Sequence, residues 1–249
     1  MGRLAYLLAL LILAGPALAG HPSECLVAQH QLEHSFALPR AAKAIAAKKF
    51  DILVVGAGSS VLPGANGAKR AYPARLQSAL AEALPGIAVT VATDVQARRT
   101  AADMLKGLPA RLAADKPALV VWQTGTVDAM LGVDPDQFSD ALDRGIDLAH
   151  AAGADVVLVN AQYSPRTESM IALGTYAEDM RWVALQHEVP LFNRFAIMRL
   201  WADLGTFDFT AARRKLEVAE RVHDCIGRLL ADVVVAAVKP GGPEADGVR

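Results

Sequence analysis

The segment 51–64 constrains the fold of this chain most strongly. It begins with an apolar run that ends at a glycine, which predicts a buried strand, and continues into a turn of small residues that carries Ser59 and Ser60. A helical pattern then opens at Tyr72. A serine on such a strand-to-helix turn can present its hydroxyl at the carboxyl end of a sheet, beside the unpaired N–H groups of the following helix. This arrangement suits a nucleophile and the anion that its attack generates.

Strand-like and helix-like segments alternate along the rest of the chain. The strand-like runs are short, rich in Val and Leu and without polar alternation, as expected of strands covered on both faces. We predict strands at 51–55, 87–92, 118–122, 154–160 and 189–192, and helices at 70–84, 100–113, 135–152, 168–187 and 210–236. This alternation predicts an α/β fold, a three-layer α/β/α sandwich with a doubly wound parallel sheet of about five strands.

The two ends of the chain carry segments that we expect to lie outside this fold. Residues 1–19 have the pattern of a secretory signal peptide, with Arg3, an apolar stretch and a small-residue cleavage site that ends at Ala19. An uncleaved N-terminal anchor is the alternative. We therefore expect a periplasmic or secreted protein with no stable membrane insertion after cleavage. It would have an N-terminal arm and first helix over 20–49, one domain over 50–238 and a disordered tail over 239–249.

The chain has two cysteines, Cys25 and Cys225, one near each end of the mature protein. In an oxidising compartment they would form a disulfide that ties the N-terminal arm to the last helix. By loop entropy such a closure contributes roughly 4–5 kcal/mol. Two unpaired thiols in a reducing compartment are the alternative.

Charge and composition argue against several classes of partner. The 25 Lys and Arg residues nearly balance the 26 Asp and Glu residues, so the chain lacks the basic footprint of a nucleic-acid-binding protein. No His/Cys cluster has a spacing typical of metal ligands, and we expect neither a metal nor another cofactor. The sequence does not predict an oligomeric state.

Polar residues follow four of the predicted strands. In a doubly wound sheet the ligand site lies beyond the carboxyl ends of the strands, so these segments are expected to meet. Tyr163 and Arg166 would line a substrate pocket there, although a turn shaped by Ser-Pro is an equal alternative. Asp94 is interpreted as a turn residue. The four segments are 58–60, 93–94, 123–128 and 162–167.

Over residues 50–235 the chain resembles the SGNH (GDSL-type) hydrolases. That family opens with Gly-Asp-Ser-Leu-x-x-Gly directly after its first strand, and residues 58–64 match this spacing with Ser59 in place of the aspartate. The match places the nucleophile on Ser60. Segments 72–76 and 116–126 also look like this family. The resemblance implies a flavodoxin-like three-layer fold and ester hydrolysis.

The blocks that supply oxyanion donors in this family are altered in this chain. The loop 94–100 lacks the family's glycine, so the backbone N–H would come from Arg98 or a neighbour. In the Gly-x-Asn-Asp block, which begins here at Gly125, Val127 replaces the asparagine and cannot donate. Loss of one such donor typically costs about 2.7–4 kcal/mol of transition-state stabilisation.

Three side chains near the valine are candidates for the oxyanion or substrate site. Gln123 or Thr126 would have to replace the missing donor. Asp128 is a further candidate at the site, and a solvated loop acid or a helix cap is the competing interpretation of this residue.

The family's last block, Asp-x-x-His, corresponds to Glu220-Arg-Val-His223, which falls within a predicted helix. Positions three apart share one side of a helix, so Glu220 would orient the imidazole of His223. The alternative for His223 is an ordinary histidine on the helix surface beside the disulfide. For Ser60 the alternative is a turn serine that caps a helix. The run 192–201 is interpreted as core with its arginines at the surface.

These residues together predict an exported serine ester hydrolase. Ser60 would attack the ester carbonyl, His223 would accept and return the proton, and Glu220 would hold the useful tautomer. The Ser60 N–H would be one oxyanion donor, and Ser59 or a residue of 123–128 the other. From the family resemblance, the substrate would be a small-molecule ester or the O-acyl groups of envelope or extracellular polysaccharide.

Two other functions compete with hydrolysis. The altered donor blocks favour a catalytically degraded SGNH-like protein that binds a glycan or a cell-envelope partner. A dinucleotide-binding protein is a weaker alternative, since Gly56 and Gly58 form half of a Gly-x-Gly-x-x-Gly motif whose third glycine is Val61 here.

Overall fold

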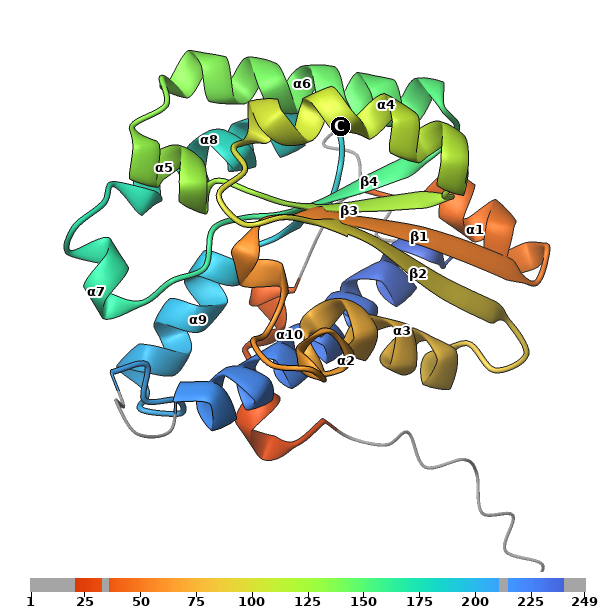
Figure 1. Cartoon of the computed structure of the whole chain (residues 1–249). Coiled ribbons are helices and arrows are strands. Elements are labelled where there is room, and N and C mark those ends of the chain that lie inside the picture. The colour runs from red at the N-terminus through yellow and green to blue at the C-terminus, as the bar shows by residue number, and fades with distance from the viewer. Residues whose placement is uncertain (1–20, 33–35, 211–214, 240–249) are drawn as a thin grey trace, which may run out of the picture.

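The computed structural model describes residues 21–32, 36–210 and 215–239. Within them a central sheet lies between two layers of helices (Figure 1). Its parallel strands follow the order β2-β1-β3-β4-β5, which confirms the predicted three-layer α/β fold. The predicted signal peptide and residues 240–249 of the predicted tail lie outside the described residues. The strands are β1 (Lys49–Gly56), β2 (Ala88–Val95), β3 (Leu119–Gln123), β4 (Asp155–Val159) and β5 (Leu191–Phe192).

The strand order creates a switch point between β1 and β3. From β1 the chain passes to β2 on one side, and it then returns past β1 to build β3, β4 and β5 on the other. Loops that leave β1 and β3 therefore turn to opposite faces of the sheet and open a crevice at the carboxyl ends of these strands. β3 and β4 are buried along their whole length, as the unbroken apolar runs predicted.

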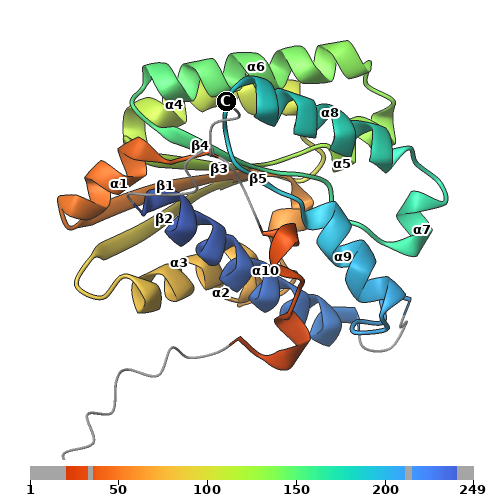
Figure 2. The same cartoon turned by 180° about the vertical axis from the view of Figure 1, so that it is seen from behind.

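Helices cover both faces of the sheet (Figures 1 and 2). The five longest match the five predicted helices, whereas the short α2, α5 and α7 and the ten-residue α9 were not predicted as helices. No helix in the described part of the chain has the length and apolar character that a membrane crossing requires. One layer holds α4 (Ala101–Asp115), α5 (Thr126–Leu131), α6 (Pro135–Ala151) and α8 (Leu173–Gln186), and the other holds α2 (Gly67–Arg70), α3 (Tyr72–Ala83), α9 (Arg194–Asp203) and α10 (Lys215–Val238).

Two small helices complete the periphery of the domain. α1 (Pro39–Ala46) packs against β1, and the carboxylate of Asp155, at the start of β4, accepts hydrogen bonds from the backbone N–H groups of Arg40 and Ala41. These bonds satisfy donors that a helix N-terminus leaves without an internal partner. α7 (Pro165–Glu168) lies in the connection from β4 to α8. The predicted first helix in segment 20–49 is therefore present as α1.

Two glycines allow helices to approach their neighbours closely. A Cβ atom at Gly145 of α6 would lie 2.1 Å from Cζ3 of the Trp122 side chain in β3. A Cβ atom at Gly227 of α10 would lie 2.4 Å from the Cβ atom of Arg75 in α3. Carbon atoms that are not bonded to each other cannot lie this close. Any larger residue at either position would therefore push the packed elements apart.

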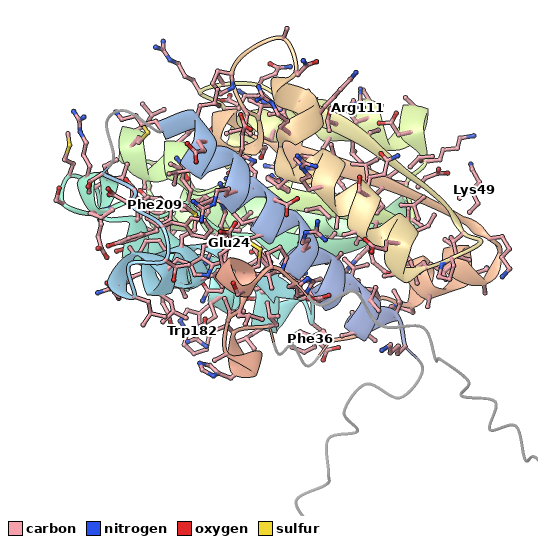
Figure 3. All side chains as sticks on the ribbon, turned by 90° about the horizontal axis from the view of Figure 1, so that it is seen from below. Glu24, Phe36, Lys49, Arg111, Trp182 and Phe209 are labelled. Carbon is pink, nitrogen blue, oxygen red and sulfur yellow. A yellow bond between two sulfur atoms is a disulfide. The ribbon has the colours of Figure 1, made fainter. Side chains whose placement is uncertain are left out.

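The N-terminal arm lies along α10. A disulfide joins Cys25 to Cys225, as the sequence predicted, across a sequence separation of 200. Ion pairs join His21 to Asp232 and Glu24 to Arg221. Figure 3 shows Glu24 beside α10. The arm is therefore held by one covalent bond and by polar contacts on either side of it.

We predict that loss of the disulfide destabilises the domain. The bond closes a loop of about 200 residues. The loss of chain entropy in the denatured state then stabilises the folded state by about 5 kcal/mol. A Cys25→Ser/Cys225→Ser variant and the reduced wild-type protein should both show a lower urea midpoint than the oxidised protein. Equal midpoints for the oxidised and reduced wild type would contradict this prediction.

Candidate active site

The two serines of the opening turn meet the end of β3 at the switch point. Ser59 and Ser60 lie in the 3₁₀ turn η3 (Gly58–Ser60), directly after β1. Both hydroxyls donate to Oε1 of Gln123, over 2.9 Å from Ser59 and 2.7 Å from Ser60. Three residues predicted for the site therefore form one hydrogen-bonded cluster.

Ser60 is part of the interior of the protein. Its exposed fraction is 0%. Because its own proton goes to Gln123, the Tyr72 hydroxyl, 3.1 Å away, must donate to Ser60 Oγ. The backbone N–H of Ser60 donates to the Ala57 carbonyl and is not available to an oxyanion as predicted. In this conformation a substrate reaches neither the hydroxyl nor the N–H of Ser60.

His223 is buried between α10 and α3. It is 5% exposed, which excludes the alternative of a helix-surface histidine. Its Nδ1 accepts the backbone N–H of Tyr72 over 3.0 Å. Burial, assisted by the positive charge of Arg194, lowers the pKa of His223 to about 3. The ring is therefore neutral, and the bond at Nδ1 places its proton on Nε2.

This tautomer changes the role that His223 can play. A general base needs a free lone pair toward the proton that it removes. Here the lone pair of Nδ1 already accepts a bond, and Nε2 carries the proton, so the imidazole is a hydrogen-bond donor. No hydrogen bond joins His223 to Ser59 or Ser60 in the described residues. The structure thus does not assemble the predicted serine and histidine into a hydrogen-bonded pair.

Glu220 does not orient the imidazole as predicted. Its carboxylate forms an ion pair with Arg70 of α2 instead. Although Glu220 and His223 are three residues apart on α10, His223 is turned into the interior while Glu220 stays at the surface between α10 and α2. A spacing of three residues did not determine the partner of the carboxylate, because the guanidinium of Arg70 lies within ion-pair distance of Glu220.

Ser59, in contrast, borders a cavity that a ligand can enter. The side chain is partly exposed, and the cavity beside it has a volume of about 570 Å³. Its walls come from the loops after β1, β2, β3 and β4, as expected at the carboxyl edge of the sheet. The lining residues are Ala57, Gly58, Ser59, Ala97, Arg98, Thr126, Val127, Met130, Leu131 and Gln162.

Several predicted site residues lie on this cavity, which we call the serine groove. Arg98 has φ of +63°, in the left-handed region that favours glycine, so its backbone adopts an unusual conformation at the expected place. The Thr126 hydroxyl oxygen accepts the backbone N–H of Gln162 over 3.3 Å. The side-chain Oε1 of Gln162 accepts from Arg194 over 3.4 Å. The amide nitrogen of Gln162 is therefore the end of that side chain left to donate.

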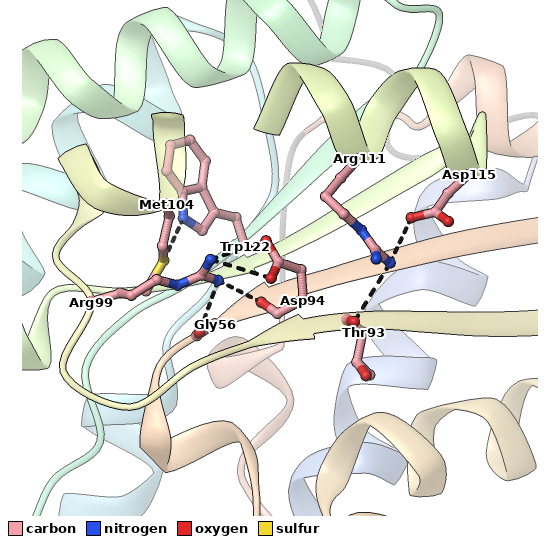
Figure 4. Close-up of polar contacts among 8 residues, drawn as sticks. All are labelled: Gly56, Thr93, Asp94, Arg99, Met104, Arg111, Asp115 and Trp122. Atoms are coloured by element: carbon pink, nitrogen blue, oxygen red, sulfur yellow. Dashed lines mark hydrogen bonds and ion pairs between the residues drawn. The ribbon is translucent and has the colours of Figure 1, made fainter. Parts of the chain in front are cut away.

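The loop after β2 is fixed to the end of β1 by Arg99 (Figure 4). The Arg99 guanidinium forms an ion pair with Asp94 and donates to the carbonyl oxygens of Asp94 and Gly56. Asp94 lies within β2, which is longer than predicted, and not in a turn. These bonds hold Arg98, the residue directly before Arg99, at the edge of the serine groove.

Asp128 connects the segment after β3 to the start of α4. It is fully buried and accepts from the Ala101 N–H, the Thr124 hydroxyl and the Gly125 N–H. Burial raises the pKa of Asp128, although these hydrogen bonds oppose the shift. The carboxyl is a cap for α5 and a link to α4, and it is not a solvated loop acid. The Gly125 N–H is occupied by this bond.

A second cavity lies on the other side of Gln162. Its volume is about 190 Å³, and Arg194 and His223 line it. Arg194 was expected at the surface, yet it is 1% exposed. Its guanidinium donates to the Ser59 carbonyl over 3.1 Å and lies 5.8 Å from the centre of the Tyr72 ring. Burial lowers the pKa of Arg194 to about 10, so the side chain is charged at neutral pH.

The sequence carries a signal for Arg194, because polar residues follow the fifth predicted strand as they follow the other four. Asn193 and Arg194 come directly after β5, and Asn193 caps α9 by accepting the Ala196 N–H. Of the segment after β4, Gln162 and Tyr163 line the second cavity, whereas Arg166 is exposed in α7.

The fold and site define a three-layer hydrolase-like protein, and comparisons with known proteins identify its family. The chain belongs to the Non-GDSL lipase-like family, whose model matches residues 24–240. It is 36% identical over 114 residues to Esterase TesA of Pseudomonas aeruginosa, a match that covers 46% of this chain and 55% of the relative. The chain thus matches about half the length of that curated relative.

Solved structures share the fold. A crystal structure of TesA superimposes with a TM-score of 0.58 at 27% identity, covering 74% of this chain and 99% of that one. A lipase/acylhydrolase from Enterococcus faecalis gives a TM-score of 0.63 at 20% identity, covering 77% of this chain and 98% of the other. These likenesses agree with the SGNH-type fold predicted from the sequence.

We predict that Asp128→Ala lowers the free energy of unfolding by at least about 3 kcal/mol, because it leaves three buried donors without an acceptor. Asp134→Ala is the matched control, since Asp134 caps α6 at an exposed position and its loss should cost about 1 kcal/mol. Urea unfolding measures both. Equal losses would contradict the structural role of Asp128.

A second prediction concerns the dependence of stability on pH. The pKa of His223 is lower in the folded protein than in the unfolded chain, so the unfolded chain binds the proton first. His223 should therefore stabilise the fold above about pH 6.5 and lose this contribution as the pH falls toward about 3.

Urea unfolding of wild type and His223→Asn at a series of pH values tests this contribution. Between these limits the wild-type curve should fall more steeply, by up to about 1.4 kcal/mol per pH unit. Parallel curves would show that His223 titrates normally in the folded protein.

Proposed function

We propose that this protein is an exported ester hydrolase that acts in the serine groove, with Ser59 as the attacking group. The observation that carries the proposal is the position of Ser59, a partly exposed residue at the carboxyl end of β1 that borders a largely apolar cavity. Membership of the Non-GDSL lipase-like family and the likeness to Esterase TesA support ester hydrolysis.

The groups around Ser59 favour particular esters. Ser59 Oγ would lose its proton to solvent water and attack the carbonyl carbon. The tetrahedral intermediate would expel the alcohol as an alkoxide, which takes a proton from water, and a second water would hydrolyse the acyl-enzyme. The Gln162 amide nitrogen would donate to the developing oxyanion, since Gln162 lines the same cavity as Ser59. No imidazole or carboxylate accepts a hydrogen bond from Ser59 or Ser60 in the described part of the chain. Esters whose alcohol departs without first gaining a proton should therefore react fastest.

Export and the natural substrate are finer parts of the proposal. The signal-peptide pattern of residues 1–19 and the disulfide between Cys25 and Cys225 support an oxidising compartment. The apolar side chains of Val127, Met130 and Leu131 in the serine groove suit an acyl group. Small-molecule esters and O-acylated polysaccharide of the envelope or the extracellular space remain the substrate classes that we propose.

A binding protein without hydrolytic activity is the second candidate. The burial of Ser60 and the hydrogen bond at His223 Nδ1 favour it, because they leave the serine inaccessible and occupy the lone pair that a general base would use. In that case the serine groove or the second cavity would hold a glycan or another envelope partner.

We predict that the mature protein hydrolyses p-nitrophenyl acetate faster than ethyl acetate, and that Ser59→Ala lowers kcat by more than about a hundredfold. Ser60→Ala tests the buried hydroxyl, and Ser78→Ala, an exposed serine of α3, is the matched control. The pH profile of kcat/KM should show no inflection near pH 6.5, because the pKa of His223 is about 3.

The variants distinguish the candidates. A loss in Ser60→Ala alone would move the nucleophile to Ser60 and would require that residue to become accessible during turnover. Turnover equal to that of the buffer for every variant and for wild type would favour the binding protein.

A further inference from the structure

Arg194 places a buried positive charge on the second cavity. Arg194 is 1% exposed, and within residues 21–32, 36–210 and 215–239 no acidic side chain forms an ion pair with it. Its described hydrogen bonds go to neutral oxygens of Ser59 and Gln162, and its buried Nε has no partner among the described residues. A buried cation is costly unless it is paired, so a site of this kind favours an anionic ligand.

Other donors line the same cavity. His223 contributes Nε2–H, because its Nδ1 accepts the Tyr72 N–H. Lys215, at the start of α10, is exposed and borders the cavity, so it adds a positive charge at the entrance. Asp208 is the acidic residue of the lining, and it lies at the exposed rim, where its Oδ1 accepts from the N–H and the hydroxyl of Thr210.

Most of the remaining wall is apolar, although Gln162 and Ser164 also line it. Its apolar side chains include Met198 of α9, Phe209, and Val218 and Val222 of α10. The planar guanidinium of an arginine matches the two oxygens of a carboxylate, whereas phosphate would bring more charge and oxygen into an apolar wall. The cavity therefore combines a polar end for one planar anion with an apolar part for a short chain.

We propose that this cavity, which we call the arginine pocket, binds a small carboxylate with an apolar tail, of the size of hexanoate. The carboxylate would accept from N–H groups of the Arg194 guanidinium that donate to neither Ser59 nor Gln162, and from His223 Nε2–H. The tail would lie against Phe209, Val218 and Val222. Its lining differs from that of the serine groove except for Gln162, which lines both cavities, and binding there does not require hydrolysis at Ser59.

Isothermal titration calorimetry with hexanoate on the oxidised mature protein tests the proposal, with hexanamide and inorganic phosphate as comparison ligands. We expect hexanoate to bind with one site per chain and hexanamide and phosphate to bind at least about tenfold more weakly. Equal binding of hexanamide would show that the pocket recognises only the apolar tail, and tighter binding of phosphate would show that it selects another anion. Either result, or no binding of hexanoate, would overturn the proposal.

Variants locate the site. Arg194→Gln should weaken hexanoate binding by at least about tenfold, with circular dichroism as the check that the fold is retained. Lys215→Gln, at an exposed position, should weaken it about two- to fivefold, whereas Lys43→Gln makes the same charge change on α1 and should have no effect. Equal effects of Lys215→Gln and Lys43→Gln, with Arg194→Gln folded and unaffected, would place the carboxylate elsewhere.

Discussion

The hydrogen bond from the Tyr72 backbone N–H to His223 Nδ1 connects most parts of the site. It joins the first turn of α3 to the middle of α10, the two helices that approach each other through Gly227. The same Tyr72 donates its hydroxyl to Ser60, and its ring lies beside the Arg194 guanidinium. One buried tyrosine therefore positions the serine turn, the imidazole and the arginine relative to each other.

This arrangement also determines the charge states of His223 and Arg194. A protonated His223 beside Arg194 would place two cations together in the interior, and burial alone already disfavours the charged ring. A neutral imidazole that donates through Nε2 is compatible with Arg194 and adds a second donor to the arginine pocket. His223, the histidine of the altered catalytic block, is thus a hydrogen-bond donor and not a base, and Ser59 is the serine of the turn that borders the serine groove.

The fold could be predicted from the sequence, whereas the contacts of the site could be predicted only in part. Apolar runs buried on both faces, such as 118–122, identify parallel strands because the pattern itself follows from burial. Strand-end positions placed Ser59, Gln123 and Thr126 near one another. Which serine faces solvent, and whether Glu220 contacts His223 or Arg70, depends on packing between α2, α3 and α10, and sequence spacing carries no information on that packing. The burial of Arg194 was missed because an arginine in an apolar run is usually exposed.

The most direct test of this account is the protonation state of His223, measured by nitrogen NMR of the imidazole in the ¹⁵N-histidine-labelled mature protein, with His223→Asn to assign the signals. We predict an unprotonated Nδ1 and a protonated Nε2 that stay unchanged from about pH 8 down to about pH 5. A proton on Nδ1, or a titration of the ring near its ordinary pKa of about 6.5, would contradict the account and restore His223 as a general base.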